Sequence, residues 1–313
     1  MRIAIGIVQA LFLVLAAPLV KGIVGRLKAG FQGRQGASIW RPYADLFKLF
    51  HKEDLIPPSA SWIFRAAPGI VFAVIVAAAA FLPVFQSSAL LGHQGDFILF
   101  VYLLAIGRFF LMLGAMDGGS AFGGMGASRD ALVSTLAEAP LLLAFVAVSI
   151  LAHSPTIVGI VEWTLGQNIL DISAVHILAF TALGIVALAE TGRMPVDNPT
   201  THLELTMIHE GMVLEYSGPS LALIEWANAI RLNVMMGLLI ALFAPWGMAA
   251  EITWGALGLA LGAWVLKVLA LTVIVAVIES GVAKLRMYLV PDFLGVATAL
   301  SLLAVIFTMI AKR

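Results

Sequence analysis

Long apolar runs alternate with shorter polar connections along this chain. A helix that spans the hydrocarbon core of a bilayer needs about 20 mostly apolar residues. The runs predict eight such helices, at residues 3–20, 68–85, 97–116, 130–152, 173–190, 221–247, 252–279 and 290–310. We see no internal repeat and no separable soluble domain. The pattern therefore predicts an all-α integral membrane bundle that forms a single domain over residues 1–313.

The composition supports this interpretation and excludes several function classes. Of the 313 residues, 61% are hydrophobic and 12% are charged, and the mean hydropathy is +1.03. Such values exclude an ordinary soluble protein, so we expect this protein to be embedded in a lipid bilayer. The formal net charge is zero, which provides no field to attract nucleic acid. The chain has no cysteine, which excludes disulfides and cysteine-ligated iron–sulfur clusters within it.

Lysine and arginine are distributed unevenly over the connections between the predicted spans. The first connection, from Lys21 to Arg65, holds eight of the 18 basic residues, and the even-numbered connections hold none. The third, fifth and seventh connections hold the further residues Arg129, Arg193, Arg231, Lys284 and Arg286. Because cytoplasmic loops are enriched in basic residues, we expect the odd-numbered connections in the cytoplasm and both termini on the outer side.

The first connection, residues 21–67, is expected to be a cytoplasmic loop with an amphipathic helix at residues 41–52. Apolar side chains recur there at helical spacing, at Tyr43, Leu46, Phe47 and Phe50. Such a helix either lies at the membrane surface and only holds the bundle, or it also docks a partner. The candidate docking residues in this connection are Arg34, Arg41, Asp45 and Lys48.

The fifth connection, at residues 191–220, is an acidic loop that follows Glu190. A helix over residues 202–216 would place His202, Thr206, His209 and Glu210 on one side and Glu204 and Glu215 near the other. A helix that is polar on two sides does not suit lipid, so we expect it between the bundle and another subunit. The two histidines are two turns apart and no HExxH motif is present, so we expect no metal site.

Ionisable residues also fall inside the predicted spans. Arg108 and Lys267 lie near the middle of the third and seventh spans, and Glu138 lies roughly 12 Å into the fourth at 1.5 Å per residue. A charge at the bilayer centre costs at least about 2.5–3.5 kcal/mol, so such groups usually pair or line a polar path. A static ion pair and a proton relay both fit this pattern. The clustering of carboxylates beside the acidic loop favours the relay.

The glycines at 118–119 and 123–126 follow a span rather than a strand. They predict a flexible connection, not a loop that binds phosphate.

Several motifs resemble those of subunit 1 of respiratory complex I (NADH:quinone oxidoreductase). The family pattern is E-T-x-R-x-P-F-D, then E-x-E-L, then E-Y-S-G. In this chain its positions are occupied by Glu190-Thr191, Arg193, Pro195, Asp197, Glu204-Leu205 and Glu215-Tyr216-Ser217-Gly218. Residues 41–48 and 52–57 are similar to the family's Q-P-x-A-D-x-x-K and K-E-D-x-x-P. Arg129 and Glu138 keep the family's nine-residue spacing between an arginine and a buried glutamate.

The chain departs from that family in ways that narrow the resemblance. Residues 33–40 replace the G-P-N-R-x-G element of the quinone-binding subunit, and Thr200 and His202 replace two loop carboxylates. The segment between Glu204 and Glu215 is also longer. This version looks like the membrane subunit of group 4 nickel–iron hydrogenases, of the formate hydrogenlyase or hydrogenase-4 type.

The resemblance implies a subunit of the prokaryotic cytoplasmic membrane that is not itself catalytic and has no cofactor. Its implied partners are a nickel–iron large subunit, an iron–sulfur small subunit, a ferredoxin-like subunit and an antiporter-like membrane subunit. It would link the hydrogenase to proton translocation along Glu138, Glu190, Asp197, Glu204, Glu210 and Glu215. Charge partners would be Arg129, Arg193, Lys267 and Arg108, and His202 and His209 would join the docking residues.

Three alternatives remain at this stage. A complex I-like oxidoreductase subunit would bind a quinone headgroup near Arg34 and Asp197, although the missing element argues against it. A passive membrane anchor would have no ion path. A stand-alone transporter would not need so polar a docking loop.

Overall fold

The computed structural model describes residues 2–311 except 93–94, 169–172, 199–206 and 250–252. These residues form helices and no strand. The helices are α1 (Arg2–Phe31), α2 (Arg41–Phe50), α3 (Trp62–Ala79), α4 (Phe97–Asp117), α5 (Ala121–Ala152), α6 (Ile157–Leu165), α7 (Ala174–Glu190), α8 (His209–Val213), α9 (Gly218–Phe243), α10 (Trp254–Gly281) and α11 (Val290–Ala311), with a 3-10 turn η2 (Met287–Leu289) before α11.

The predicted membrane bundle is confirmed. Seven of the described helices are long and apolar enough to cross a membrane, and α7 is a shorter apolar helix of 17 residues. Helix α2 has the predicted amphipathic pattern and no fully buried residue. The eight predicted spans therefore correspond to α1, α3, α4, α5, α7, α9, α10 and α11, and α6 was not predicted.

Three spans differ clearly from the prediction in their boundaries, among them α5, which begins at Ala121 rather than at residue 130. Helix α1 continues through its basic residues to Phe31 rather than ending near residue 20. Helix α3 begins at Trp62, because the Ser61 side chain caps it, and it runs through Pro68 to end at Ala79. The chain after α3 turns away because buried Gln9 holds its backbone: Gln9 Oε1 accepts from the N–H groups of Val84 (2.6 Å) and Phe85 (2.8 Å).

The glycine-rich segment at 123–126 is not a flexible connection but the first turns of α5. The Ser120 side chain caps this helix by accepting from the Gly123 N–H at 3.0 Å. A Cβ at Gly123 would lie 2.3 Å from the Ala115 carbonyl oxygen, and one at Gly126 would lie 2.8 Å from that of Ile208. The glycines therefore allow α5 to approach α4 and the segment before α8 closely.

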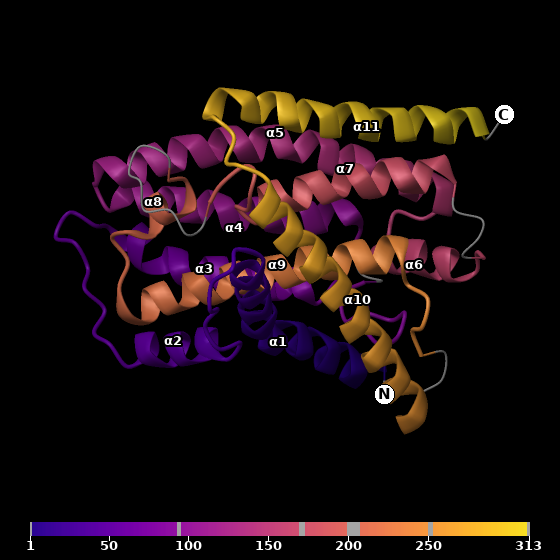
Figure 1. Ribbon diagram of the computed structural model, residues 1–313, viewed down its shortest axis with the longest axis horizontal. Coiled ribbons are helices and arrows are strands. Elements are labelled where there is room, and N and C mark those ends of the chain that lie inside the picture. Colours follow the sequence, from indigo (N-terminus) through magenta and orange to yellow (C-terminus); the bar gives the residue numbers. More distant parts are fainter. Residues whose placement is uncertain (1, 93–94, 169–172, 199–206, 250–252, 312–313) are drawn as a thin grey trace.

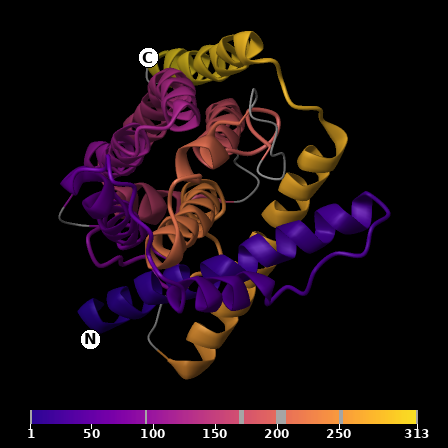
Figure 2. The same cartoon turned by 90° about the vertical axis from the view of Figure 1, so that its left-hand side faces the viewer.

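Helix α9 is the centre of the bundle. Its best membrane-length window is 83% buried, whereas that of α10 is only 22% buried. Helix α9 packs against α3, α1, α2, α7, α6 and α10, and α11 covers α5 and α7. Figure 2 looks along the bundle and shows α1 crossing it obliquely, with α10 also steeply tilted. The most buried helix is thus the one that carries Glu225, Asn228 and Arg231.

Successive spans require successive connections to lie on alternate sides of the membrane, and hydrogen bonds between the connections agree with this arrangement. On one side, the Ser59 hydroxyl donates to the Gly118 carbonyl (3.3 Å) and the Leu285 N–H donates to that of Pro195 (2.8 Å). On the other side, the Ala249 N–H donates to the Phe85 carbonyl (2.7 Å). Odd-numbered connections therefore meet one another, as do even-numbered ones. Both ends of the chain lie toward the right in Figure 1, away from α2 and α8.

Candidate functional site

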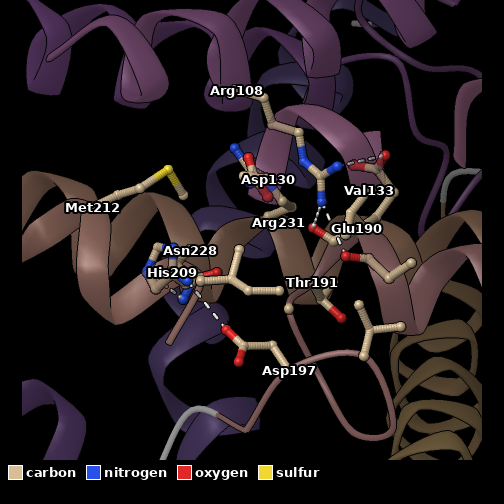
Figure 3. A pocket seen from close by; sticks show the side chains of 14 residues that line it. Arg108, Asp130, Val133, Glu190, Thr191, Asp197, His209, Met212, Asn228 and Arg231 are labelled. Atoms are coloured by element: carbon tan, nitrogen blue, oxygen red, sulfur yellow. Dashed lines mark hydrogen bonds and ion pairs between the residues drawn. The ribbon is translucent and has the colours of Figure 1, made fainter. Parts of the chain in front are cut away.

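The central ionic contact of the bundle joins Arg108 of α4 to the end of α7. Arg108 is 3% exposed and Glu190, the last residue of α7, is 5% exposed. The Nη2 of Arg108 donates to the carbonyls of Ala189 and Glu190, both at 3.0 Å, and Nη1 lies 3.5 Å from Glu190 Oε1. A cation at a helix C-terminus satisfies carbonyls that the helix leaves without partners. Arg108 therefore stabilises both a charge and a helix end (Figure 3).

Asp130 of α5 and Arg231 of α9 lie beside this contact, and each is 7% exposed. We call Arg108, Asp130, Glu190 and Arg231 the central charge cluster. A cavity of about 20 Å³ is lined by these four residues and also by Asp197, His209 and Asn228. That volume is sufficient for one water molecule. Four atoms of the cluster have no hydrogen-bond partner within the described residues: Arg108 Nε and Nη1, Glu190 Oε2 and Arg231 Nε.

A second cavity, of about 70 Å³, adjoins the same Arg108–Glu190 contact. It is lined by Glu138 together with Ser134 and Thr135 of α5. Glu138 is half-buried and lines this cavity. Arg108 and Glu190 line both cavities, so the two cavities are neighbours. Asp197 lines the first cavity and Glu138 lines the second.

Asp197 is the centre of a second group of polar contacts, in the connection between α7 and α9. Its Oδ1 accepts from Lys284 Nζ at 2.6 Å and its Oδ2 accepts from the backbone N–H of His209 at 3.1 Å. The His209 ring in turn lies 3.2 Å from Asn228 Nδ2 of α9. Asp197 therefore joins the connection before α11 to the start of α8.

Glu279, near the end of α10, is 4% exposed and pairs with two cations. Its Oε1 lies 2.6 Å from Arg193 Nη1 and its Oε2 lies 3.3 Å from Lys28 Nζ. The contact joins α1, α10 and the segment after α7. Arg193, predicted as a charge partner of the path, is thus bound to a carboxylate that was not among the predicted path residues.

Two of the motifs that carried the resemblance are in contact with each other. The Leu55 N–H donates to the Ser217 hydroxyl at 2.7 Å, and Ser220 Oγ donates to Asp54 Oδ2 at 2.5 Å. Tyr216 is buried and its ring stacks on Phe64 with centroids 4.1 Å apart. Burial raises the pKa of the Tyr216 hydroxyl well above its ordinary value, and the charges of Asp117 and Asp54 add to the effect. This hydroxyl therefore stays protonated.

Gly218 allows the two motifs to approach, and Gly218→Val should separate them. Its φ of +49° is unfavourable for other residues, and a Cβ there would lie 2.4 Å from the Glu53 carbonyl oxygen. We expect the free energy of unfolding in detergent to fall by about 1–3 kcal/mol, as for other strained or overpacked sites. Gly25→Val is the control, since a Cβ there meets nothing within 4 Å. Equal stability of both variants would contradict the prediction.

The remaining predicted residues are not all near the cluster. Arg129 donates to the Met207 carbonyl at 2.9 Å, and Lys267 donates to the carbonyls of Ala244 and Trp246 beyond the end of α9. Glu210 and Glu215 are partly exposed. Arg34 is exposed and does not line the cavity that contains Asp197, while Arg41 pairs with Asp45 at 2.8 Å and Lys48 is exposed. His202 and Glu204 lie outside the described residues.

The predicted helix over residues 202–216 is wrong in its extent. The described part forms only α8, five residues from His209 to Val213. Residues 207 and 208 lie outside this helix; the His209 N–H donates to Asp197, and Arg129 donates to the Met207 carbonyl. Tertiary contacts rather than helical periodicity therefore determine this segment.

The sequence interpretation missed several members of the site. The structure places Arg231 in the middle of α9 rather than in a connection, and it adds Asp130 of α5, which was not among the predicted site residues. One pattern could have identified Arg231: Glu225, Asn228 and Arg231 are three residues apart and share one side of α9. Glu225 pairs with Lys21 of α1 at 2.5 Å. No comparable pattern marks Asp130.

Comparison with known proteins is consistent with this architecture. The model of the NADH dehydrogenase family matches residues 3–309. The chain is 33% identical over 299 residues to hydrogenase-4 component C of Escherichia coli (strain K12), which covers 96% of this chain and 93% of that protein. It is 32% identical over 295 residues to formate hydrogenlyase subunit 4 of the same organism, which covers 93% and 94%.

A more distant relative is a subunit of the NADH-quinone oxidoreductase of Rubrobacter xylanophilus, 30% identical over 250 residues, with 77% of this chain and 75% of that protein covered. The fold matches a chain in the structure of the membrane-bound sulfane sulfur reductase, an archaeal respiratory membrane complex. The TM-score is 0.86 at 20% identity, over 98% of this chain and 100% of that one.

These relatives are subunits of multi-subunit membrane complexes, which implies partner subunits for this chain. The family match covers nearly the whole sequence, and the apolar helices account for a multi-pass membrane protein. The chain therefore belongs to the NADH dehydrogenase subunit 1 family and is a homologue of hydrogenase-4 component C and formate hydrogenlyase subunit 4, membrane subunits of group 4 hydrogenase complexes.

Proposed function

We propose that this chain anchors a nickel–iron hydrogenase arm to the cytoplasmic membrane and couples it to proton movement. The observation that carries the proposal is the pair of adjoining polar cavities that begin near Asp197, pass the Arg108–Glu190 contact and extend to Glu138. A bundle that served only as an anchor would be expected to fill these spaces with apolar side chains, because buried polar groups without partners are costly.

Two carboxylates along this route, Glu190 and Glu138, suit transfer rather than permanent pairing. Glu190 has one carboxylate oxygen without a hydrogen-bond partner, and its contact with Arg108 Nη1 is long, at 3.5 Å. Glu138 has no ion pair among the described residues and faces a cavity of about 70 Å³, large enough for more than one water. A carboxyl group in such surroundings can accept and release a proton, with water as the bridge.

The docking part of the proposal rests on the end of the bundle where the odd-numbered connections meet. Helix α2 presents Arg41, Phe47 and Lys48 outward, and Trp40 before it is exposed. The proposed partners are a nickel–iron large subunit and iron–sulfur subunits at this cytoplasmic end, and an antiporter-like subunit within the membrane. The termini would then face outward.

The substitution Glu138→Gln separates an ion path from a passive anchor. The amide has nearly the shape of the carboxyl group and keeps hydrogen bonding, so the complex should assemble. It cannot carry a proton, so ion movement per hydrogen molecule formed should be abolished. Hydrogen evolution and membrane potential, measured together on purified complexes in vesicles, give this ratio. Glu138→Asp should retain part of it.

The matched control is Glu162→Gln, because Glu162 is an exposed glutamate of α6 away from both cavities. It should leave assembly and coupling unchanged. If Glu138→Gln complexes assemble and move ions as the unchanged protein does, Glu138 is not part of a proton path. Loss of assembly alone would instead assign a structural role to this carboxyl group.

A further inference from the structure

The central charge cluster contains a carboxylate that the proposed path does not yet use. Asp130 and Glu190 both line the cavity of about 20 Å³, from α5 and α7 respectively. Each is more than nine-tenths buried. No hydrogen bond or ion pair to the Asp130 carboxylate is found among the described residues. A buried aspartate that only held helices together would be expected to form an ion pair or a hydrogen bond with another helix. The absence of such a contact therefore argues against a purely structural role for Asp130.

The surrounding groups indicate a ligand of the size of water in the cavity that both carboxylates line. Glu190 Oε2 and Arg231 Nε are buried atoms without partners, one an acceptor and the other a donor. A water molecule can donate to the first and accept from the second, and the cavity has room for it. The other charged or titratable residues lining the cavity are Arg108, Asp197 and His209.

We propose that Asp130 is a second proton-holding carboxylate of the path, which exchanges a proton with Glu190 through one water molecule. The O–H bond of the Asp130 carboxyl breaks as that proton moves to the water, and the proton that the water donates toward Glu190 Oε2 bonds to that oxygen; the reverse transfer returns a proton to Asp130. The charge of the cluster is unchanged by this exchange. Arg108 and Arg231 both interact with Asp130 electrostatically, so a cation stands beside whichever carboxylate is ionised.

This inference rests on the proposed ion path and adds to it a proton-holding residue, Asp130, with Arg231 as its counter-ion. It predicts that Asp130→Asn complexes assemble and form hydrogen but move ions roughly 10-fold less per hydrogen molecule, or less still, because the amide cannot hold the proton. Asp130→Glu should recover part of the coupling. Asp292→Asn, at an exposed acidic residue of α11, is the matched control and should have no effect.

A double variant distinguishes proton holding from charge balance. If Asp130 only neutralises Arg231, Asp130→Asn combined with Arg231→Gln should restore coupling, since the cluster is again neutral. If Asp130 holds the proton, the double variant should remain uncoupled. Infrared difference spectra of the working complex provide an independent measure: a protonated-carboxyl band that shifts in D₂O should disappear in Asp130→Asn and persist in Asp292→Asn.

The outcomes separate this inference from the function on which it rests. Uncoupling by Glu138→Gln together with full coupling in Asp130→Asn would overturn the role of Asp130 and leave the ion path intact. Full coupling in both would overturn both. Restored coupling in the double variant, with the infrared band retained in Asp130→Asn, would reduce Asp130 to a counter-charge.

Discussion

Arg108→Gln should lower the free energy of unfolding by about 3–5 kcal/mol, the usual cost of removing one member of a buried ion pair. Two losses combine here. Glu190, 5% exposed, would lose its ion pair with the guanidinium, and the carbonyls of Ala189 and Glu190 would lose their donor. Glutamine is too short to reach all three groups. Denaturant titration of the detergent-solubilised protein measures the change.

Arg65→Gln is the control for this prediction, because Arg65 is an exposed arginine of α3. It should change stability by less than about 0.5 kcal/mol, as most surface substitutions do. If the Arg108 variant were as stable as this control, other groups would have to donate to the carbonyls at the end of α7. The Arg108–Glu190 contact would then not contribute to stability.

Glu279→Gln should have an effect of similar size, again about 3–5 kcal/mol. The carboxylate lies between Arg193 at 2.6 Å and Lys28 at 3.3 Å, and both cationic side chains are largely buried. Without it, two like charges would face each other with no counter-ion. We therefore expect low yield and a lower melting temperature.

Combining Glu279→Gln with Lys28→Gln tests the cause of this effect. The double variant leaves Arg193 as the one cation of the original three-residue contact, so it removes the repulsion and should recover part of the stability. Absence of any recovery would mean that the lost hydrogen bond from Arg193, rather than repulsion between the two cations, causes the loss of stability.

Most of the fold could be predicted from the sequence because bilayer-spanning helices must be long and apolar. The same apolar runs predicted that successive connections lie on alternate sides, and the spacing of apolar residues at 43–50 predicted α2. The boundaries could not be predicted so well. Gln9 is one polar residue in an apolar span, yet it decides where the chain turns after α3. Such a contact across 75 residues of sequence leaves no local trace.

The site was predictable only in part, for a related reason. Acidic residues near helix ends could be recognised individually, and Glu190 and Asp197 are indeed found beside the same cavity. Their partners could not be assigned, since a charge at one span can meet any neighbouring helix. Arg193 pairs with Glu279, while Lys267 binds main-chain carbonyls instead of a carboxylate. Asp130 follows Arg129 at the start of a predicted span, and Arg231 stands between Ile230 and Leu232.

Helix α10 packs against α1 and is also held by polar contacts at two positions. Lys267 binds the carbonyls after α9, and Glu279, twelve residues further and about 18 Å away along the helix, binds Lys28 and Arg193. Between these points an apolar cavity of about 260 Å³ separates α10 from α7 and α9. The polar contacts thus hold α10 near its middle, at Lys267, and near its end, at Glu279. We therefore expect that loss of either polar contact would let α10 shift at that position and change the width of this cavity.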